Sequence, residues 1–276
     1  MLIHQYRRAR ITSTKGGFDE VENTIVFKGG YDDCCDGHAV RSDTFKRHGL
    51  VVSLVLMALL TFPSCQSQPS TRILFIGNSY TFVNDGLDKQ LEGLSPSTET
   101  ARIAFGGYTL EKHWTDGNAL QKIRAGNWDY VVLQEQSQAP ILNQQKFYEF
   151  ALMFDREIRR SGARTILLMT WERPDSKNWG VTTDGLAAAF TAIGKKLGAK
   201  VAPAGLAFAR SLQAKPDLTL YTPDGHPTVE GTYLAACVLY RTIFELNPVG
   251  NPYSEKNISA ETRTYLQQIA ADSSQF

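Results

Sequence analysis

Hydrophobic and polar positions along residues 70–250 fall into two alternating kinds of segment. Short, continuous apolar runs form the first kind, and they occur at 72–76, 103–105, 130–133, 165–169 and, more weakly, 200–203. Apolar runs without regular polar interruption are typical of strands that are buried on both faces, as in a parallel sheet. The pattern therefore predicts five strands that share one buried sheet.

Helical patterns fill the gaps between these runs. Apolar residues recur at three- and four-residue spacing across 147–158 and 186–197, and Gly198 is predicted to cap the second of these helices. Further helices are predicted at 87–94, 110–114, around 120–123 and at 229–246. Strands that alternate with helices predict right-handed βαβ crossovers. The expected fold class is α/β, a three-layer α/β/α sandwich with a central, mostly parallel sheet of about five strands.

A separate apolar run precedes the predicted sheet. Residues 50–60 follow Lys46-Arg47 and lead into Ser64-Cys65. A basic flank, an apolar stretch of about 7–15 residues and a small-residue exit are typical of a secretory signal. The run is shorter than the ~20 residues that cross a bilayer. A buried core helix is the alternative interpretation.

The end of this run suggests a lipid anchor and a domain plan. Residues 62–65 resemble a bacterial lipobox, which implies lipidation of Cys65 and membrane attachment through that anchor only. Because Gln66 rather than Asp follows, the expected location is the outer membrane, facing the periplasm or the cell surface. The predicted parts are an unstructured or misassigned leader (1–40), a signal peptide (41–65), a tether (66–70), the folded domain (71–250) and a C-terminal tail or helix (251–276).

Composition and charge exclude some classes of function. Of the 276 residues, 42% are hydrophobic and 21% charged, as expected for a globular protein with a core. The net charge of +1 and the lack of a basic stripe give no reason to expect nucleic acid as a partner. The four cysteines include no Cys-x-x-Cys pair, so no metal site is predicted. Nothing in the sequence indicates an oligomeric state.

Ligands of open α/β sheets bind beyond the carboxyl ends of the strands, so the residues after each run are the candidates. Ser79 follows the first run behind Gly77-Asn78, where a hydroxyl can project at a helix N-terminus; a simple helix cap is the alternative. Gly106-Gly107 follow the second run. They could bring backbone N–H groups close to a ligand or form an ordinary turn.

The third and fourth runs are also followed by polar and aromatic residues. Gln134 and Gln136 could each donate a side-chain amide to an oxyanion, unless this segment is a solvated loop. Trp171 and Arg173 suit a sugar face or an anionic group, and Tyr108 suits stacking on a sugar. Core or surface packing is an equally good interpretation of these residues.

Two histidines remain beyond residue 65, namely His113 and His226. A serine nucleophile needs an adjacent base, usually a histidine, that a third group orients. His226 lies in the turn-rich segment 221–227, two residues after Asp224, and is therefore the preferred base. His113 falls in the predicted helix at 110–114 and is kept as a candidate substrate contact.

Taken together, the blocks Gly77-Asn78-Ser79, Gly106-Gly107 and Asp224-Gly225-His226 resemble those of the SGNH/GDSL hydrolases over about residues 71–245. The resemblance implies that Ser79 is the nucleophile, His226 the base and Asp224 its orienter. It also implies an oxyanion site formed by the N–H groups of Ser79 and Gly107 and by a glutamine amide, with Asn78 beside them, and no metal or cofactor.

Three departures from the family pattern stand out. Asn78 replaces the usual Asp, and Gln134 or Gln136 must replace the usual Asn donor after the third strand. Asp224 lies two residues before His226 rather than three, so a backbone carbonyl could take over its role.

The expected function is that of a serine esterase that cleaves a small-molecule or glycan ester, with removal of acetyl groups from glycans as the favoured reaction. A lipase or thioesterase is the competing chemistry. A catalytically silent, glycan-binding lipoprotein on the same scaffold is the competing class. A flavodoxin-like phosphate binder is less favoured because the chain lacks a glycine-rich phosphate loop.

Overall fold

The computed structural model describes residues 70–273. The predicted leader, signal peptide and lipidation site at Cys65 lie outside these residues. Within residues 70–273, no helix combines the length and the apolar character needed to cross a membrane.

Five parallel strands form one sheet, as the apolar runs predict, in the order β2-β1-β3-β4-β5. Their bounds are β1 Thr71–Gly77, β2 Thr98–Ala104, β3 Tyr130–Leu133, β4 Arg164–Leu168 and β5 Lys200–Ala202. The parallel register runs from β2 to β5 without a break, for example Leu74 opposite Val131 and Val131 opposite Thr165. The α/β fold class expected from the sequence is confirmed.

The second strand begins five residues before the predicted one. β2 reads Thr-Glu-Thr-Ala-Arg-Ile-Ala, and most of its side chains are only partly buried. It pairs with β1 alone and is therefore an edge strand. A strand at the edge of a sheet can carry polar side chains, so the search for continuous apolar runs found only its last two residues.

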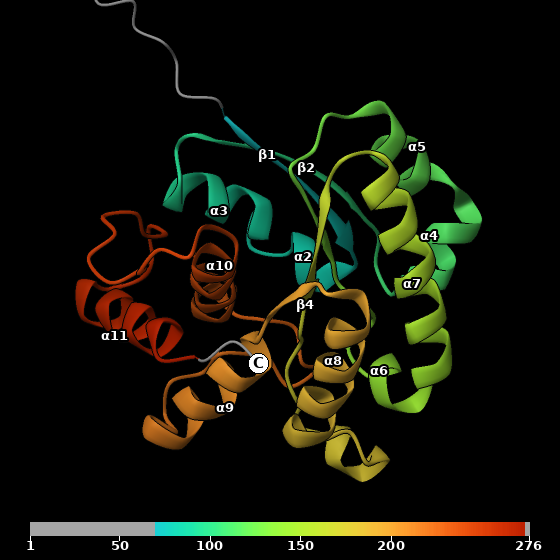
Figure 1. Cartoon of the computed structure of the whole chain (residues 1–276). Helices are drawn as coiled ribbons and strands as arrows, with labels where there is room; N and C mark the ends of the chain where they lie inside the picture. The colour runs from blue at the N-terminus through green and yellow to red at the C-terminus, as the bar shows by residue number, and fades with distance from the viewer. Residues whose placement is uncertain (1–69, 274–276) are drawn as a thin grey trace, which may run out of the picture. The chain divides into compact units, whose positions relative to one another are not determined.

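One face of the sheet is covered by helices from both halves of the chain (Figure 1). Ile73 and Phe75 of β1 point to this face and share one buried cluster with these helices. The helices are α3 Leu87–Leu94, α9 Ala204–Ala214, α10 Val229–Phe244 and α11 Ala260–Ala271. α9 was not predicted from the sequence.

The opposite face is covered by helices from the middle of the chain (Figure 1). Leu74 and Ile76, the alternate residues of β1, point to this side. The helices are α4 Leu110–Asp116, α5 Asn118–Ala125, α7 Gln144–Arg160 and α8 Thr183–Leu197. Gly198 ends α8 in the left-handed conformation, as expected. The two clusters on either side of the sheet make up the predicted three-layer sandwich.

Residues beyond 250, expected to be a tail or a helix, contribute to the core. Leu266, Ile269 and Ala270 of α11 are buried in the same cluster as α10. The Gln267 side chain donates hydrogen bonds to the Tyr233 hydroxyl and the Asn251 carbonyl. The buried core therefore continues to the end of α11.

Three short elements follow strand ends. Helix α2 (Ser79–Phe82) follows β1, α6 (Ala139–Leu142) follows β3, and the 3-10 turn η1 (Ser176–Trp179) follows β4. The strand order places β1 between β2 and β3, so the chain leaves β1 at the point where the order of the sheet reverses. Ligands of open α/β sheets bind at such points.

Candidate active site

The turn between β1 and α2 carries Ser79. Asn78 caps α2, and its side-chain oxygen accepts a hydrogen bond from Tyr80 N at 3.1 Å. A Cβ on Gly77 would lie 2.3 Å from Thr81 Oγ1 and 2.5 Å from Gln134 Oε1. Only glycine leaves room for this close approach, which brings Ser79 sharply out of the strand end.

Ser79, His226 and Asp224 form one hydrogen-bonded line, although 147 residues separate the first two in the chain. Ser79 Oγ lies 2.8 Å from His226 Nε2, and His226 Nδ1 lies 2.9 Å from Asp224 Oδ2. In the matching neutral tautomer, Nδ1–H donates to Asp224 and Nε2 accepts from the Ser79 hydroxyl. This is the arrangement in which a histidine can take a proton from a serine.

The loop that carries His226 is held in place by its own backbone. Thr222 N donates to His226 O at 2.8 Å, and Tyr221 pairs with Pro227 across the loop. Trp171, which follows β4, donates its indole N–H to Gly225 O at 3.0 Å. These contacts orient the imidazole toward Ser79.

The carboxylate of Asp224 is largely open to solvent, with 68% of its side chain exposed. The Thr222 hydroxyl, followed by the backbone and side chain of His226, lowers the pKa of Asp224 to about 2. Asp224 therefore stays ionised over the whole physiological range. It can hold the tautomer of His226 even though only Gly225 separates the pair in the sequence.

Two backbone N–H groups, in the turns that follow β1 and β2, make no hydrogen bond within the described residues. Within residues 70–273, neither Ser79 N nor Gly107 N donates to a protein group. Gly107 has φ +71°, a conformation that favours glycine, and no atom lies within 4 Å of its would-be Cβ. The Gly106-Gly107 turn thus presents exposed backbone, which fits both a ligand contact and an ordinary turn.

The prediction that Gln134 could donate its amide to an oxyanion is wrong, because its side chain is engaged inside the protein. Gln134 is buried, and its Oε1 accepts from Asn78 N at 2.8 Å and from Thr81 Oγ1 at 2.9 Å. Its Nε2 donates to Glu135 O. Both ends of the amide are therefore used inside the protein, and Gln134 supports the Ser79 turn instead of facing a ligand.

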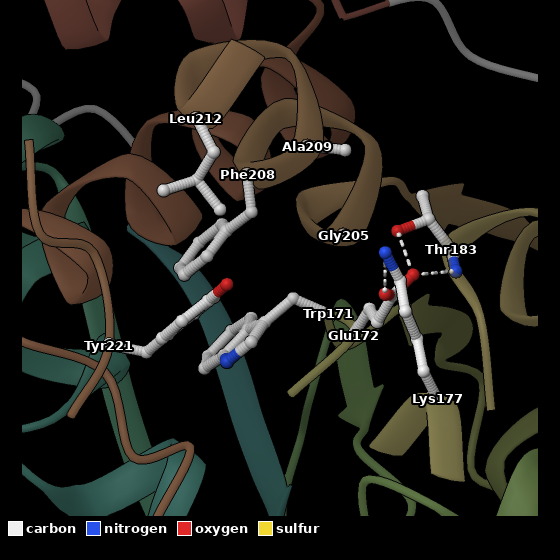
Figure 2. A pocket seen from close by; sticks show the side chains of 9 residues that line it. All are labelled: Trp171, Glu172, Lys177, Thr183, Gly205, Phe208, Ala209, Leu212 and Tyr221. Atoms are coloured by element: carbon white, nitrogen blue, oxygen red, sulfur yellow. Dashed lines mark hydrogen bonds and ion pairs between the residues drawn. The ribbon is translucent and has the colours of Figure 1, made fainter. Parts of the chain in front are cut away.

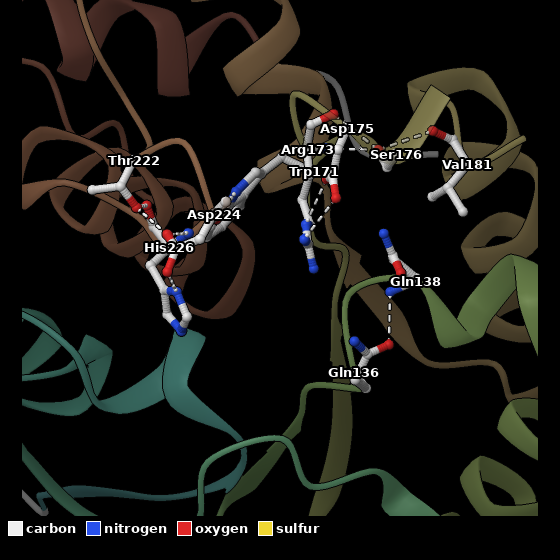
Figure 3. Close-up of polar contacts among 11 residues, drawn as sticks. Gln136, Gln138, Trp171, Arg173, Asp175, Ser176, Val181, Thr222, Asp224 and His226 are labelled. Atoms are coloured by element: carbon white, nitrogen blue, oxygen red, sulfur yellow. Dashed lines mark hydrogen bonds and ion pairs between the residues drawn. The ribbon is translucent and has the colours of Figure 1, made fainter. Parts of the chain in front are cut away.

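Gln136 remains as the candidate amide donor. Its Oε1 accepts from Gln138 N at 2.9 Å and Ala139 N at 3.0 Å. Those bonds fix the amide plane and leave Nε2 without a protein partner within the described residues. Figure 3 shows the Arg173 guanidinium between His226 on one side and the side chains of Gln136 and Gln138 on the other.

His113 and Trp171 do not reach the ligand side, contrary to the sequence-based expectation. His113 is 2% exposed, and its Nε2 lies 2.7 Å from Gly77 O, so it supports the end of β1. Burial lowers the pKa of His113, which keeps the ring neutral. Trp171 is buried between the rings of Tyr80 and Phe208, at centroid distances of 4.8 and 4.1 Å. Polarity and position in the chain did not reveal that both side chains point inward.

Asn78 and Tyr108 link two of the predicted blocks. Asn78 Nδ2 donates to Tyr108 O at 3.2 Å. The partly exposed Tyr108 ring packs against Phe105 at 4.9 Å, and Phe105 is 43% exposed. Tyr108 and Phe105 therefore form an aromatic rim on the glycine turn, whereas Asn78 is a buried support.

A buried carboxyl was missed by the sequence analysis. Glu135 is 2% exposed at the end of β3, where burial raises its pKa to about 7. In the sequence it is one of five consecutive polar residues, 134–138, and nothing in that run distinguishes it from the others.

A cavity of about 260 Å³ lies next to these elements (Figure 2). Trp171, Phe208 and Tyr221 form its aromatic side, while Glu172 and Lys177 stand opposite. Glu172 is fully engaged, since it accepts from Thr183 N at 2.8 Å and pairs with Lys177. Neither Ser79 nor His226 lines this cavity, so the cavity is separate from the hydrogen-bonded residues Ser79, His226 and Asp224. Across residues 70–273, no cluster of three His, Cys, Asp or Glu side chains could hold a metal ion.

Comparison with known proteins gives matches in structure alone. No family model and no curated protein matches the sequence. A solved structure from Slackia heliotrinireducens, assigned to the SGNH hydrolases, is 28% identical with a TM-score of 0.55, over 63% of this chain and 99% of that one. A DUF4886 family protein from Bacteroides uniformis is 19% identical with a TM-score of 0.59, over 73% and 93%.

A third structure, from Parabacteroides merdae and assigned to the GDSL-like lipases, is 13% identical with a TM-score of 0.52. It covers 63% of this chain and 96% of that one. At identities of 19% and 13%, the second and third matches show only that the fold is similar.

Proposed function

We propose that this chain, which belongs by its fold to the SGNH/GDSL-like hydrolases, is a serine esterase that forms an acyl-enzyme on Ser79. The observation that carries the proposal is the 2.8 Å hydrogen bond between Ser79 Oγ and His226 Nε2 at the carboxyl end of β1. A serine hydroxyl is a weak nucleophile unless a base removes its proton, and this contact supplies the base.

The reaction starts when His226 Nε2 takes the proton of the Ser79 hydroxyl as Oγ attacks the ester carbonyl. Asp224 stabilises the resulting imidazolium through Nδ1–H. The alcohol leaves with the proton from Nε2. Water then attacks the acyl-enzyme, again with His226 as base, and releases the acid and free Ser79.

The negative charge of the tetrahedral intermediate falls on the former carbonyl oxygen. We assign the N–H groups of Ser79 and Gly107 and the Nε2 of Gln136 to that oxygen, because these donors have no partner within the described residues and follow the ends of β1, β2 and β3. Preorganised donors of this kind are worth about 10²–10³ in rate each. Every group that this mechanism needs comes from the chain itself.

The acyl group is proposed to be small and the alcohol a glycan. Figure 3 shows the side chains of Arg173, Gln136 and Gln138 on one side of His226, and their hydrogen-bond donors favour a polar, hydroxyl-rich alcohol over a long alkyl chain. Nε and Nη2 of Arg173 are held by Asp175 at 3.2 and 3.1 Å, which leaves Nη1 for a ligand. The exposed ring of Phe105 and the partly exposed ring of Tyr108 add an apolar rim.

The proposal extends to where the esterase acts. The basic flank, apolar run and Cys65 of residues 41–65 support export and attachment to a membrane by a lipid, with the catalytic part facing a glycan outside the cytoplasm. Such a location would put the enzyme beside acetylated polysaccharide.

Acetate release tests the function. Residues 66–276 and their Ser79→Ala variant are incubated with p-nitrophenyl acetate and with acetylated xylan. The proposal expects hydrolysis of both esters by the wild type and a loss of at least about 10⁴-fold in the variant. Hydrolysis of the small ester alone would keep the mechanism and reject the glycan. Equal rates for both folded proteins would reject the esterase.

A further inference from the structure

A carboxyl group lies buried beside the oxyanion donors without touching the reacting atoms. Glu135 follows Gln134 directly after β3 and is 2% exposed. Within residues 70–273 no cation pairs with it, and its partners are backbone N–H groups. Burying an ionisable group without a counter-ion is costly, so its position calls for a role.

The partners of Glu135 belong to two different segments. Gln136 N donates to Glu135 Oε1 at 2.7 Å. Leu110 N lies 3.3 and 3.4 Å from the two carboxyl oxygens. Leu110 is the first residue of α4 and lies three residues after Gly107, beyond Tyr108 and the N-cap Thr109. One carboxyl group therefore joins the glycine turn to the residue that carries the free glutamine amide.

The other attachments of the glycine turn lie upstream of Leu110. Phe105 N donates to Gly77 O at 3.3 Å, and Asn78 Nδ2 donates to Tyr108 O at 3.2 Å. Gly107 itself is exposed and makes no contact through its would-be Cβ. Gly77 and Asn78 therefore fix the turn to the end of β1. Glu135 adds the direct link between the segment that follows the turn and the backbone of Gln136.

We propose that Glu135 is a positioning residue, whose carboxylate holds the Gly107 turn and Gln136 at the separation that an oxyanion requires. The inference rests on the proposed esterase function, because it concerns the oxyanion donors of the same site. Glu135 takes no part in proton transfer to or from the ester.

Ionisation strengthens this link. A carboxylate accepts N–H bonds more strongly than a neutral carboxyl group does. Burial raises the pKa of Glu135 to about 7, the Gln136 and Leu110 amides oppose that rise, and the charge of Glu111 adds to it. Glu111 of α4 is itself paired with Lys146 of α7 at 2.7 Å. The link is therefore expected to tighten as the pH rises through neutrality.

The kinetic test compares Glu135→Gln with Glu111→Gln as a matched control. The first change keeps the side chain's size, but its amide NH₂ must face one of the two N–H donors. We expect kcat of Glu135→Gln for p-nitrophenyl acetate to fall by about 10- to 100-fold. This loss is no larger than the loss in kcat on removing one oxyanion donor. KM should stay within about twofold of the wild-type value. The acid side of the kcat–pH profile should lose one ionisation. Glu111→Gln should keep the wild-type kcat and the slopes on both sides of the kcat–pH profile.

Backbone amide exchange gives a readout that does not depend on turnover. In folded Glu135→Gln, the amides of Leu110 and Gln136 should exchange faster than in the wild type, while core amides of β1 and β3 keep their rates. Unchanged kcat, or unchanged exchange at both amides, would overturn the proposal. A uniform rise across the core would also overturn it, because it would show a general loss of stability.

The two proposals fail separately. If the wild type shows no Ser79-dependent hydrolysis, the esterase is rejected, and exchange alone decides whether Glu135 holds the two segments. If Glu135→Gln does not fold, amide exchange is measured on the wild type instead. The two conditions are about pH 5.5 and about pH 8.5, on either side of the Glu135 pKa of about 7. Slower exchange of Leu110 and Gln136 at the higher pH, corrected for intrinsic rates, supports the link, and equal protection rejects it.

Discussion

At the scale of single residues, the solvent exposure of Asp224 limits how much this carboxylate can contribute to kcat. Its carboxylate is held by Thr222 and His226 but is 68% exposed, so water competes with every interaction it makes. A buried aspartate in a serine protease triad is worth about 10⁴ in kcat. Asp224 should contribute less, because its field is screened.

Asp224→Asn should therefore lower kcat by about 10- to 100-fold, well below the effect of removing Ser79 or His226. Steady-state kinetics on p-nitrophenyl acetate measures this difference. Because the pKa of Asp224 is lowered to about 2, protonation of this carboxyl should not limit activity anywhere above about pH 4. A loss as large as that of Ser79→Ala would show that the exposed carboxylate acts as a buried one does.

His113 makes the stability of the fold depend on pH. Burial lowers the pKa of His113, and the hydrogen bond to Gly77 O and the charge of Asp116 oppose that shift only in part. Below the ordinary histidine pKa of about 6.5, the unfolded chain takes up a proton that the native state resists. This difference removes stability as the pH falls.

Urea denaturation of the wild type and His113→Gln across about pH 5 to about pH 8 checks this sign. The free energy of unfolding of the wild type should fall toward acid pH more steeply than that of the variant. The glutamine amide can still donate to Gly77 O, so the variant should fold. Parallel curves would show that His113 titrates alike in both states.

At the scale of elements, the turn between β1 and α2 has no space for a side chain. A Cβ on Gly77 would meet Thr81 Oγ1 at 2.3 Å and Gln134 Oε1 at 2.5 Å, and both atoms belong to the buried support of Ser79. Gly106, in the turn after β2, has no atom within 4 Å of its would-be Cβ.

Gly77→Ala should break the Gln134 hydrogen bonds and reduce kcat/KM by at least about 100-fold, with a loss of stability of about 1–3 kcal/mol. Gly106→Ala serves as the control and should leave stability within about 0.5 kcal/mol. Thermal unfolding and esterase assays on both variants measure the contrast. Equal behaviour of the two variants would mean that the Gly77 turn can relax at little cost.

The sequence predicted the buried elements well and the exposed ones poorly. β1, β3 and β4 are buried on both faces and appear as apolar runs, and α7 and α8 show clear helical periodicity. The edge strand β2 was shortened because it carries partly exposed polar residues. α9, Ala204–Ala214, is an exception: it was missed although Ala207 and Phe208 are buried, because only Pro203 separates it from β5 and no polar break marks where the strand ends and the helix begins.

The site followed a similar rule. The contact between Ser79 and His226 could be expected because few residue types can activate a serine, and the two side chains do form a hydrogen bond. Their catalytic roles stay a prediction. The direction of a side chain after a strand could not be read from the sequence. Gln134 and Trp171 point inward, Gln136 points outward, and Glu135 is buried within a polar run. Only the packing of neighbouring loops separates these cases.

At the scale of the whole molecule, the C-terminal helix completes the layer that supports the His226 segment. α11 packs on α9 and α10, and α10 begins three residues after His226. Leu266 is fully buried in that layer, and Gln267 ties it to Tyr233 of α10. The layer should therefore depend on α11 for its stability.

Leu266→Ala should lower the free energy of unfolding by about 2–5 kcal/mol, the usual range for removing a buried leucine side chain. Thr264→Ala, on the exposed side of the same helix, should change it by less than about 0.5 kcal/mol. Chemical denaturation of the two variants gives both values. A small effect of Leu266→Ala would indicate that α11 can leave the core without cost.

The central claim, that His226 activates Ser79 as a nucleophile, is tested most directly by covalent trapping. The wild type, Ser79→Ala and His226→Ala are each treated with a fluorophosphonate, and the intact masses and labelled peptides are measured. We expect one adduct on Ser79 in the wild type, none in Ser79→Ala, and labelling slowed by at least about 10³-fold in His226→Ala. A wild type that stays unlabelled while folded, or labelling of Ser79 at the same rate without His226, would contradict the claim.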